Sequence, residues 1–242
     1  MNRRHSLAVA ARKKRCPLEH PLFVPERGPG GEVFKPCSKF HGPPLYLHWS
    51  PSPRVPAVSH VPPSVESLYA AFPGAADRPD FEGIPPADMP EPFRRLLVHT
   101  HHMTVTVEAF YGQAVDVRVL DARLTGDTYC RKIVLALRDA GDVVQFGIVR
   151  VHLAKLPPRV GHEIIEGETP LGRVLIQNDV LRHIEPGGYF RVSPCRQLCD
   201  WFEVAAPTTC WGRTGTIFAD RQPAVEVLEI LAPVPKPWQP GC

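Results

Sequence analysis

The chain has 242 residues, which suits one sizeable domain or two small ones, and its net charge of +3 is too small to predict a nucleic-acid-binding surface over the whole protein. The sequence shows neither the apolar core of a secretory signal nor an apolar run long enough to cross a membrane, so we expect no membrane span. Its seven cysteines are scattered and form no Cys-x-x-Cys pair, which favours reduced thiols in a cytoplasmic protein.

Residues 1–92 are predicted to form a largely irregular extension. Most of the 29 prolines lie there, and proline removes backbone donors and fixes φ, which disfavours sheets and long helices. Residues 1–15 are basic and contain no acid, a pattern typical of a solvated start but also compatible with a tail for acidic partners or an organelle-targeting peptide. One short helix is expected over Ser64–Phe72, with Ser64 as its cap.

From Phe93 onward the hydrophobic patterns become regular. Spacing predicts helices at 93–98, 157–167 and 169–177, and alternation predicts strands at 103–110, 115–123, 129–138, 143–153, 180–192, 209–219 and 224–231. Long strands joined by short turns predict antiparallel pairing. We therefore predict the α+β class, an antiparallel β-sheet with a few helices packed on it, in a domain of residues 93–235 that follows the proline-rich arm and precedes a tail of residues 236–242.

The segment Thr169-Pro-Leu-Gly-Arg173 is typical of a helix start that can bind an anion. Thr169 suits the N-cap because its hydroxyl can accept from a backbone N–H one turn later, and Pro170 suits the first helical position. The next backbone donors are those of Leu171 and Gly172, and Gly172 lets a ligand approach the backbone closely. Most helix starts meet only water, so this pattern needs support from other residues.

Four segments together resemble the chorismate lyase family, whose members remove pyruvate from chorismate to leave 4-hydroxybenzoate. They occur in the family's order and with roughly its spacing over residues 94–233. The segments are His102-Met103-Thr104, Tyr129-Cys-Arg131-Lys-Ile-Val-Leu135, Thr169-Pro-Leu-Gly-Arg173, and Trp211-Gly-Arg213 with Leu228-Glu229-Ile-Leu-Ala-Pro233. The first 92 residues have no counterpart in the compact bacterial lyases.

The resemblance implies a role for each matching residue. It implies that Arg131 holds the ring carboxylate and that Leu171 donates its backbone N–H to the ligand, with its side chain secondary. It implies that Glu229 contacts the oxygen at the far side of the ring. Substrate-binding positions beside these are Met103, Thr104, Gly172 and Arg213. Gly147 departs from the pattern, in a strand where it could line the pocket.

The function that the resemblance implies is a chorismate pyruvate-lyase, an enzyme associated with ubiquinone biosynthesis. We expect Arg131 to anchor the carboxylate and Glu229 to assist proton transfer at the ether oxygen, because burial can raise the pKa of a glutamate towards neutrality. The expected partner is a small chorismate-like carboxylate and not nucleic acid, and no cofactor or metal is required. The alternative is a non-catalytic module of the same fold that binds an aromatic acid.

Two groups of residues are weaker candidates for metal sites. Cys16 and His20, with Cys37 and His41, could form a Cys₂His₂ zinc site, but their spacing is unlike that of the usual zinc fingers. His99 and His101 would share a face in a strand, although no carboxylate or cysteine of matching placement is evident nearby. We therefore expect no metal site.

Overall fold

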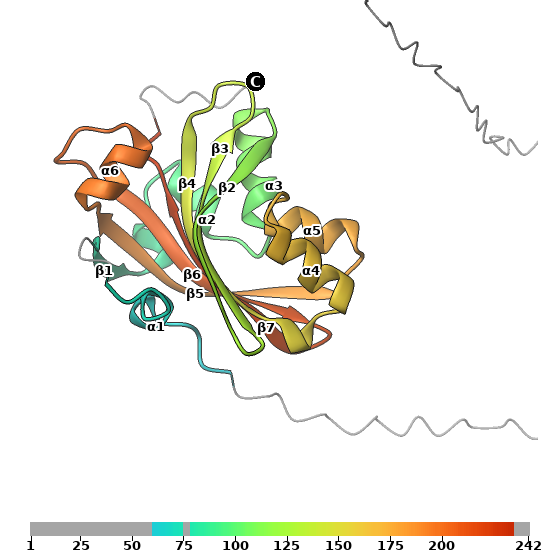
Figure 1. Cartoon of the computed structure of the whole chain (residues 1–242). Helices are drawn as coiled ribbons and strands as arrows, with labels where there is room; N and C mark the ends of the chain where they lie inside the picture. Colours follow the sequence, from blue (N-terminus) through green and yellow to red (C-terminus); the bar gives the residue numbers. More distant parts are fainter. Residues whose placement is uncertain (1–59, 75–77, 235–242) are drawn as a thin grey trace, which may run out of the picture. The chain divides into compact units, whose positions relative to one another are not determined.

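The computed structural model describes residues 60–74 and 78–234, and within them seven strands form one antiparallel sheet in the order β1-β5-β6-β7-β4-β3-β2 (Figure 1). The strands are β1 (Asp80–Ile84), β2 (Val115–Thr125), β3 (Thr128–Leu137), β4 (Val143–His152), β5 (Arg182–Ser193), β6 (Cys210–Ala219) and β7 (Gln222–Leu231). The helices are α1 (Val65–Tyr69), α2 (Phe93–Leu97), α3 (Met103–Tyr111), α4 (Pro158–Glu166), α5 (Leu171–Gln177) and α6 (Arg196–Phe202), with 3-10 turns η1 (Pro86–Asp88) and η2 (Leu153–Lys155). The predicted α+β class is confirmed.

Helices cover both faces of the sheet, so its central strands are buried on both sides. In Figure 1, α1 and α6 lie on one side of the sheet and α3, α4 and α5 on the other. Alternate residues of one strand therefore enter different clusters: Val134 packs with α1 and α6, whereas Ile133 and Leu135 pack with α2 and α3. This two-sided burial explains why β3, β4, β6 and β7 are buried along most of their length.

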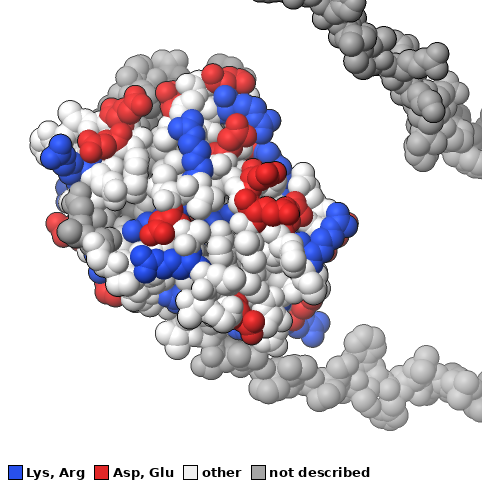
Figure 2. Space-filling view, in the orientation of Figure 1, with Lys and Arg blue, Asp and Glu red and all other residues white. Residues whose placement is uncertain are grey.

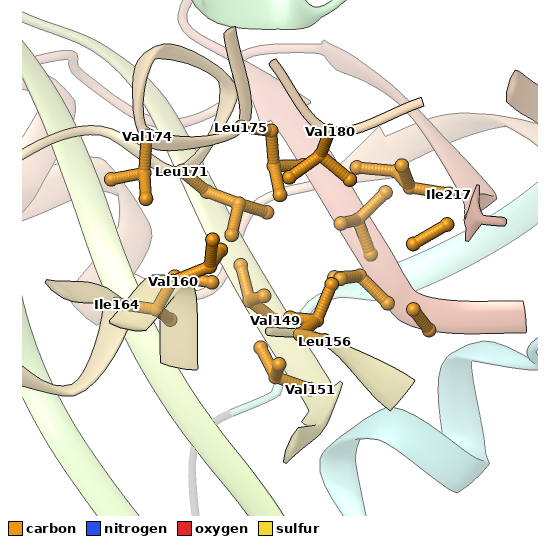
Figure 3. Close-up of a cluster of buried hydrophobic side chains, with 14 of the residues drawn as sticks. Val149, Val151, Leu156, Val160, Ile164, Leu171, Val174, Leu175, Val180 and Ile217 are labelled. Atoms are coloured by element: carbon orange, nitrogen blue, oxygen red, sulfur yellow. The ribbon is translucent and has the colours of Figure 1, made fainter. Parts of the chain in front are cut away.

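The face that carries α2–α5 holds two separate hydrophobic clusters. One lies under α2 and α3 and includes Met103, Val107 and Ile133. The other lies under α4 and α5 and includes Leu171 and Val149, and Figure 3 shows how its side chains converge from both helices and the sheet. The line where these clusters meet crosses the middle of the sheet.

Local sequence signals explain most helix boundaries. Ser64 caps α1 as expected, since its hydroxyl accepts from the Ser67 N–H at 3.1 Å. α4 ends at Gly167, whose φ of 74° is the left-handed conformation that glycine adopts without strain. The expected cap of α5 is wrong: the N-cap is Pro170, helix α5 begins at Leu171, and Thr169 lies before it.

The strand predicted at 103–110 is helix α3 instead. Alternation of Val105, Val107 and Ala109 suggested a strand, and β-branched residues favour that interpretation. In the structure Met103 and Val107, four residues apart, are buried on one helical face while Val105 is exposed. Packing against the sheet therefore overrides local preference here.

Residues 60–92, expected within the extension, contribute α1, β1 and the 3-10 turn η1 to this fold. Strand β1 pairs with β5, and α1 packs against β4 and β7. Arg150 joins α1 to the sheet, since it donates to the Ser67 carbonyl and to Glu226. Residues 1–59, which include the basic start and the Cys16/His20 and Cys37/His41 pairs, lie outside the described residues. In the part of the chain described, no helix combines the length and apolarity needed to span a membrane.

Candidate functional site

A cavity of about 50 Å³ lies where the two hydrophobic clusters meet, between the sheet and the starts of α3 and α5. A cavity needs on the order of 10–15 Å³ to hold one water, so this one has room for a small ligand group. Its lining is mostly apolar with a few polar groups, as in small-molecule sites. The lining residues are His102, Met103, Thr104, Val117, Arg131, Ile133, Leu135, Gln145, Gly147, Val149, Pro170, Leu171, Gly172, Ile217, Val227, Leu228 and Glu229.

Arg131 is a buried cation on the cavity wall, only 1% exposed. Its Nη1 donates to the Ile164 carbonyl at 3.0 Å, where α4 ends. Its Nε is buried and has no hydrogen-bond acceptor among the described residues. Burial lowers the pKa of Arg131, and a hydrogen bond with Tyr129 opposes that shift. The ion pairs formed within the described residues do not include Arg131. An anion in the cavity would supply the missing acceptor.

Glu229 faces the same cavity but is already paired. Its Oε2 accepts from Arg213 Nε at 2.7 Å, and the two residues are direct partners on β7 and β6. Arg213 also donates to the carbonyls of Leu97, His99 and His101, at 2.7, 2.8 and 3.4 Å. Arg213 therefore holds the segment between α2 and α3 against the sheet, and Glu229 balances its charge. Arg213 lines an adjoining hollow of about 20 Å³, and Glu229 lines the same hollow.

The other predicted site residues lie around the same cavity. Met103 and Thr104 line it from the first turn of α3, and Leu171 and Gly172 from the first turn of α5. A Cβ at Gly172 would lie 3.1 Å from both His102 Cβ and Thr104 Oγ1, so the missing side chain lets α5 approach α3. The Leu171 side chain packs in the cluster under α4 and α5 (Figure 3), so it is part of the core, contrary to the expectation that it is secondary.

His102 separates the cavity from an open groove of about 790 Å³. Its Nε2 accepts from Arg182 Nε at 2.5 Å, and Arg182 Nη1 donates to the Val180 carbonyl. Burial, together with the positive charges of Arg182 and Arg213, lowers the pKa of His102 to about 4. The imidazole is therefore neutral at pH 7, as its role as acceptor requires. His102 thus lines both the cavity and the groove, and Arg182 lines the groove beside it.

Sequence reasoning gave no site role to two polar cavity residues, Gln145 and His102, although His102 lies in one of the segments that carry the resemblance. Gln145 is 3% exposed, and its Oε1 has no donor among the described residues. The signal was a single amide in the otherwise apolar run of residues 143–149, two residues before Gly147 on the same face. The suspicion that Gly147 could line the pocket agrees with its place in the cavity wall.

The face seen in Figure 2 and the metal-ligating side chains of the described residues offer no competing site. On the face seen in Figure 2, acidic and basic side chains are interspersed. No group of three or more His, Cys, Asp or Glu side chains is placed to hold a metal ion among the described residues. His99 and His101 stack with ring centroids 5.4 Å apart, and His99 Nδ1 accepts from the His101 backbone.

No family model and no curated protein matches this chain. Among solved structures it is similar to PhnF from Mycobacterium smegmatis (TM-score 0.40, 12% identity, 56% of this chain and 65% of that one) and to its effector domain (0.40, 12%, 55% and 88%). It is also similar to a GntR-family transcriptional regulator from Bacillus cereus (0.36, 7%, 53% and 96%). The chain thus spans less than two thirds of full-length PhnF. At these scores the similarity assigns no function.

These comparisons correct the expected identity of the protein. The assignment to the chorismate lyase family, with its enzymatic activity and its link to chorismate and ubiquinone biosynthesis, is wrong, because the similar structures named above are regulator and effector domains and none of them is a lyase. The expected exclusion of nucleic acid as a partner is wrong too, because the Bacillus cereus structure is a transcriptional regulator.

Proposed function

We propose that this domain binds a small organic anion in the cavity between the sheet and the starts of α3 and α5. The observation that carries the proposal is Arg131, a buried guanidinium on the cavity wall whose Nε has no acceptor among the described residues. Buried charges are normally paired, and a guanidinium suits planar carboxylates because it presents several donors in a fixed fork. A bound carboxylate would neutralise Arg131 and accept from its Nε.

The remaining predicted site residues have defined parts in this proposal. Met103 and Leu171 supply apolar walls from α3 and α5, while Thr104 and Gly172 line the cavity between them. Glu229 and Arg213 form the ion pair that fixes the wall beyond the ligand. The cavity is smaller than the roughly 150 Å³ that holds benzene in an engineered protein, so a larger ligand must displace part of the cover formed by α3 and α5.

A cytoplasmic setting, expected from the cysteine pattern, belongs to the same proposal. Cys130, Cys199 and Cys210 carry free thiols. Burial raises the pKa of the Cys210 thiol to about 12, which keeps it protonated. Reduced thiols are typical of cytoplasmic proteins.

The test is anion-dependent stabilisation of the full chain. Thermal unfolding is measured with acetate, propionate, butyrate, benzoate and phosphate against chloride at equal ionic strength. A bound anion raises the midpoint, since ligands that bind only the folded state stabilise it. Arg131→Met should abolish the rise, whereas Arg138→Met, which changes an exposed arginine paired with Asp116, should leave it intact. Equal responses of the two variants would refute the proposal.

A further inference from the structure

We infer that the ligand carries a hydroxyl group separated from its acid group by a spacer, and that Gln145 accepts a hydrogen bond from this hydroxyl. The inference rests on the proposed anion site at Arg131 and specifies the ligand that fits it. It follows from two residues that line the cavity, Arg131 and Gln145, each of which has a buried polar atom, one a donor and one an acceptor, without a partner among the described residues.

The neighbours of Gln145 in the sheet offer its amide oxygen no side-chain donor. Its register partners on β3 and β7 are Leu135 and Leu231, both buried and apolar. Nearly all buried polar groups in proteins have a hydrogen-bond partner, because burial removes their hydrogen bonds to water and an unpaired group gains none in return. A ligand in the cavity that Gln145 and Arg131 line would supply a donor to this oxygen and an acceptor to Arg131 Nε.

The sheet register places these two groups at opposite ends of the cavity wall. Arg131 is the partner of Val149, and Gln145 lies four residues further along β4, on the same face. Four residues of a strand span about 13 Å, and the two side chains cover part of that distance. We therefore expect a ligand that reaches both to hold its hydroxyl away from its carboxylate, unlike a 2-hydroxy acid.

Gly147 keeps the wall open between the two polar groups. It lies midway between Val149 and Gln145, and its partners are Ile133 and Glu229. A Cβ at this position would lie 3.3 Å from both Ile133 Cδ1 and the Leu228 carbonyl oxygen. The backbone of Gly147 thus forms the floor over which the spacer lies.

Matched ligand pairs on the unchanged full chain test the inference. Titration calorimetry compares propionate with lactate and with 3-hydroxypropionate, butyrate with 4-hydroxybutyrate, and valerate with 5-hydroxyvalerate. We expect at least one terminal hydroxy acid to bind tenfold more tightly than its parent acid (1.4 kcal/mol), with no gain for lactate. Gln145→Leu should reduce that preference below twofold while the parent acids still bind, and Gln177→Leu, at an exposed position of α5, should leave it unchanged.

The outcomes separate this inference from the proposed function. If parent and hydroxy acids bind equally to the unchanged protein, the role of Gln145 is refuted and anion binding stands. If the preference persists in Gln145→Leu, another group accepts from the hydroxyl and the inference is again refuted. If no acid in the series binds, the anion site and the inference both fall. The ligand comparison requires no variant to fold.

Discussion

Arg213 Nε donates to Glu229 Oε2 at 2.7 Å across neighbouring strands, and this pair lies on the same sheet face as Arg131, two residues along the register. The Arg213 and Glu229 side chains are 3% and 12% exposed. Arg213 is thus paired with a carboxylate, whereas Arg131, on the same face, has no carboxylate partner among the described residues. The paired arginine fixes the scaffold, and the other is available to a ligand.

Removing Glu229 should destabilise the protein. Glu229→Ala leaves the buried charge of Arg213 without its carboxylate, and we expect the free energy of unfolding to fall by about 3 kcal/mol. Glu229→Gln retains a carbonyl acceptor and should cost less. Urea unfolding measures both. Glu82→Ala, which removes an exposed partner of Arg191, is the control and should change stability by less than about 0.5 kcal/mol. Equal losses at the two positions would contradict the structural role of the pair.

Removing Arg131 should cost little stability in the absence of ligand. Arg131→Met eliminates a buried charge that lacks a carboxylate, which offsets the lost hydrogen bonds to the Ile164 carbonyl and to Tyr129. We expect a change within about 1 kcal/mol, whereas Ile148→Ala, at a fully buried position on the other face, should cost about 2–5 kcal/mol. Urea unfolding in chloride buffer compares them, and a loss at Arg131 as large as that at Ile148 would assign Arg131 to the scaffold.

His102 should make the protein less stable in acid. Its pKa is about 4 in the folded chain and about 6.5 when unfolded, so between these values the unfolded state binds more protons. The stability contribution is therefore complete above pH 6.5 and lost as the pH falls towards 4, by on the order of 3 kcal/mol. Burial lowers the pKa of His99 to about 4 as well, which acts in the same direction.

The variant His102→Gln isolates this contribution. Its free energy of unfolding, followed from pH 7.5 to 4, should decline less steeply than that of the unchanged chain. Exposed His183→Gln should leave the slope unaltered. Parallel curves for the unchanged chain and His102→Gln would show that His102 is protonated equally in both states.

Gly172 should tolerate no added methyl group without cost. Gly172→Ala places a Cβ 3.1 Å from His102 Cβ and Thr104 Oγ1, and overpacking of this kind costs about 1–3 kcal/mol. Gly83→Ala is a matched control, since nothing lies within 4 Å of a Cβ there. Thermal unfolding of the two variants measures the difference, and a neutral Gly172→Ala would mean that α3 and α5 can separate freely.

Leu171 should be sensitive to loss of its side chain. It packs in the cluster under α4 and α5, so Leu171→Ala should lower the free energy of unfolding by about 2–5 kcal/mol. Ile176→Ala, at a partly exposed position of the same helix, should cost much less. Urea unfolding distinguishes the two. A mild effect at Leu171 would restore the expectation that only its backbone matters.

Much of the fold could be predicted from local pattern. Alternation and apolar runs located β2 to β7, and helix spacing located α2, α4 and α5, because those signals depend on neighbours in sequence. Helix α3 was missed, since Thr and Val at alternate positions imitate a strand until the sheet buries Met103 and Val107 together. Local patterns also could not predict that β1 pairs with β5, because the paired residues of the two strands lie more than a hundred positions apart in the sequence.

The sequence by itself determined the fold class and the candidate set around Arg131, Leu171 and Glu229, which the tertiary structure brings to one cavity. Only the tertiary structure decided which cation of that face is available. Arg131 and Arg213 are the same residue type in the sequence. In the structure Arg213 donates to Glu229 and to loop carbonyls, whereas Arg131 Nε lacks an acceptor among the described residues. Hydrogen-bond satisfaction depends on three-dimensional neighbours, so no sequence pattern could distinguish the two arginines or show that the amide oxygen of Gln145 lacks a donor.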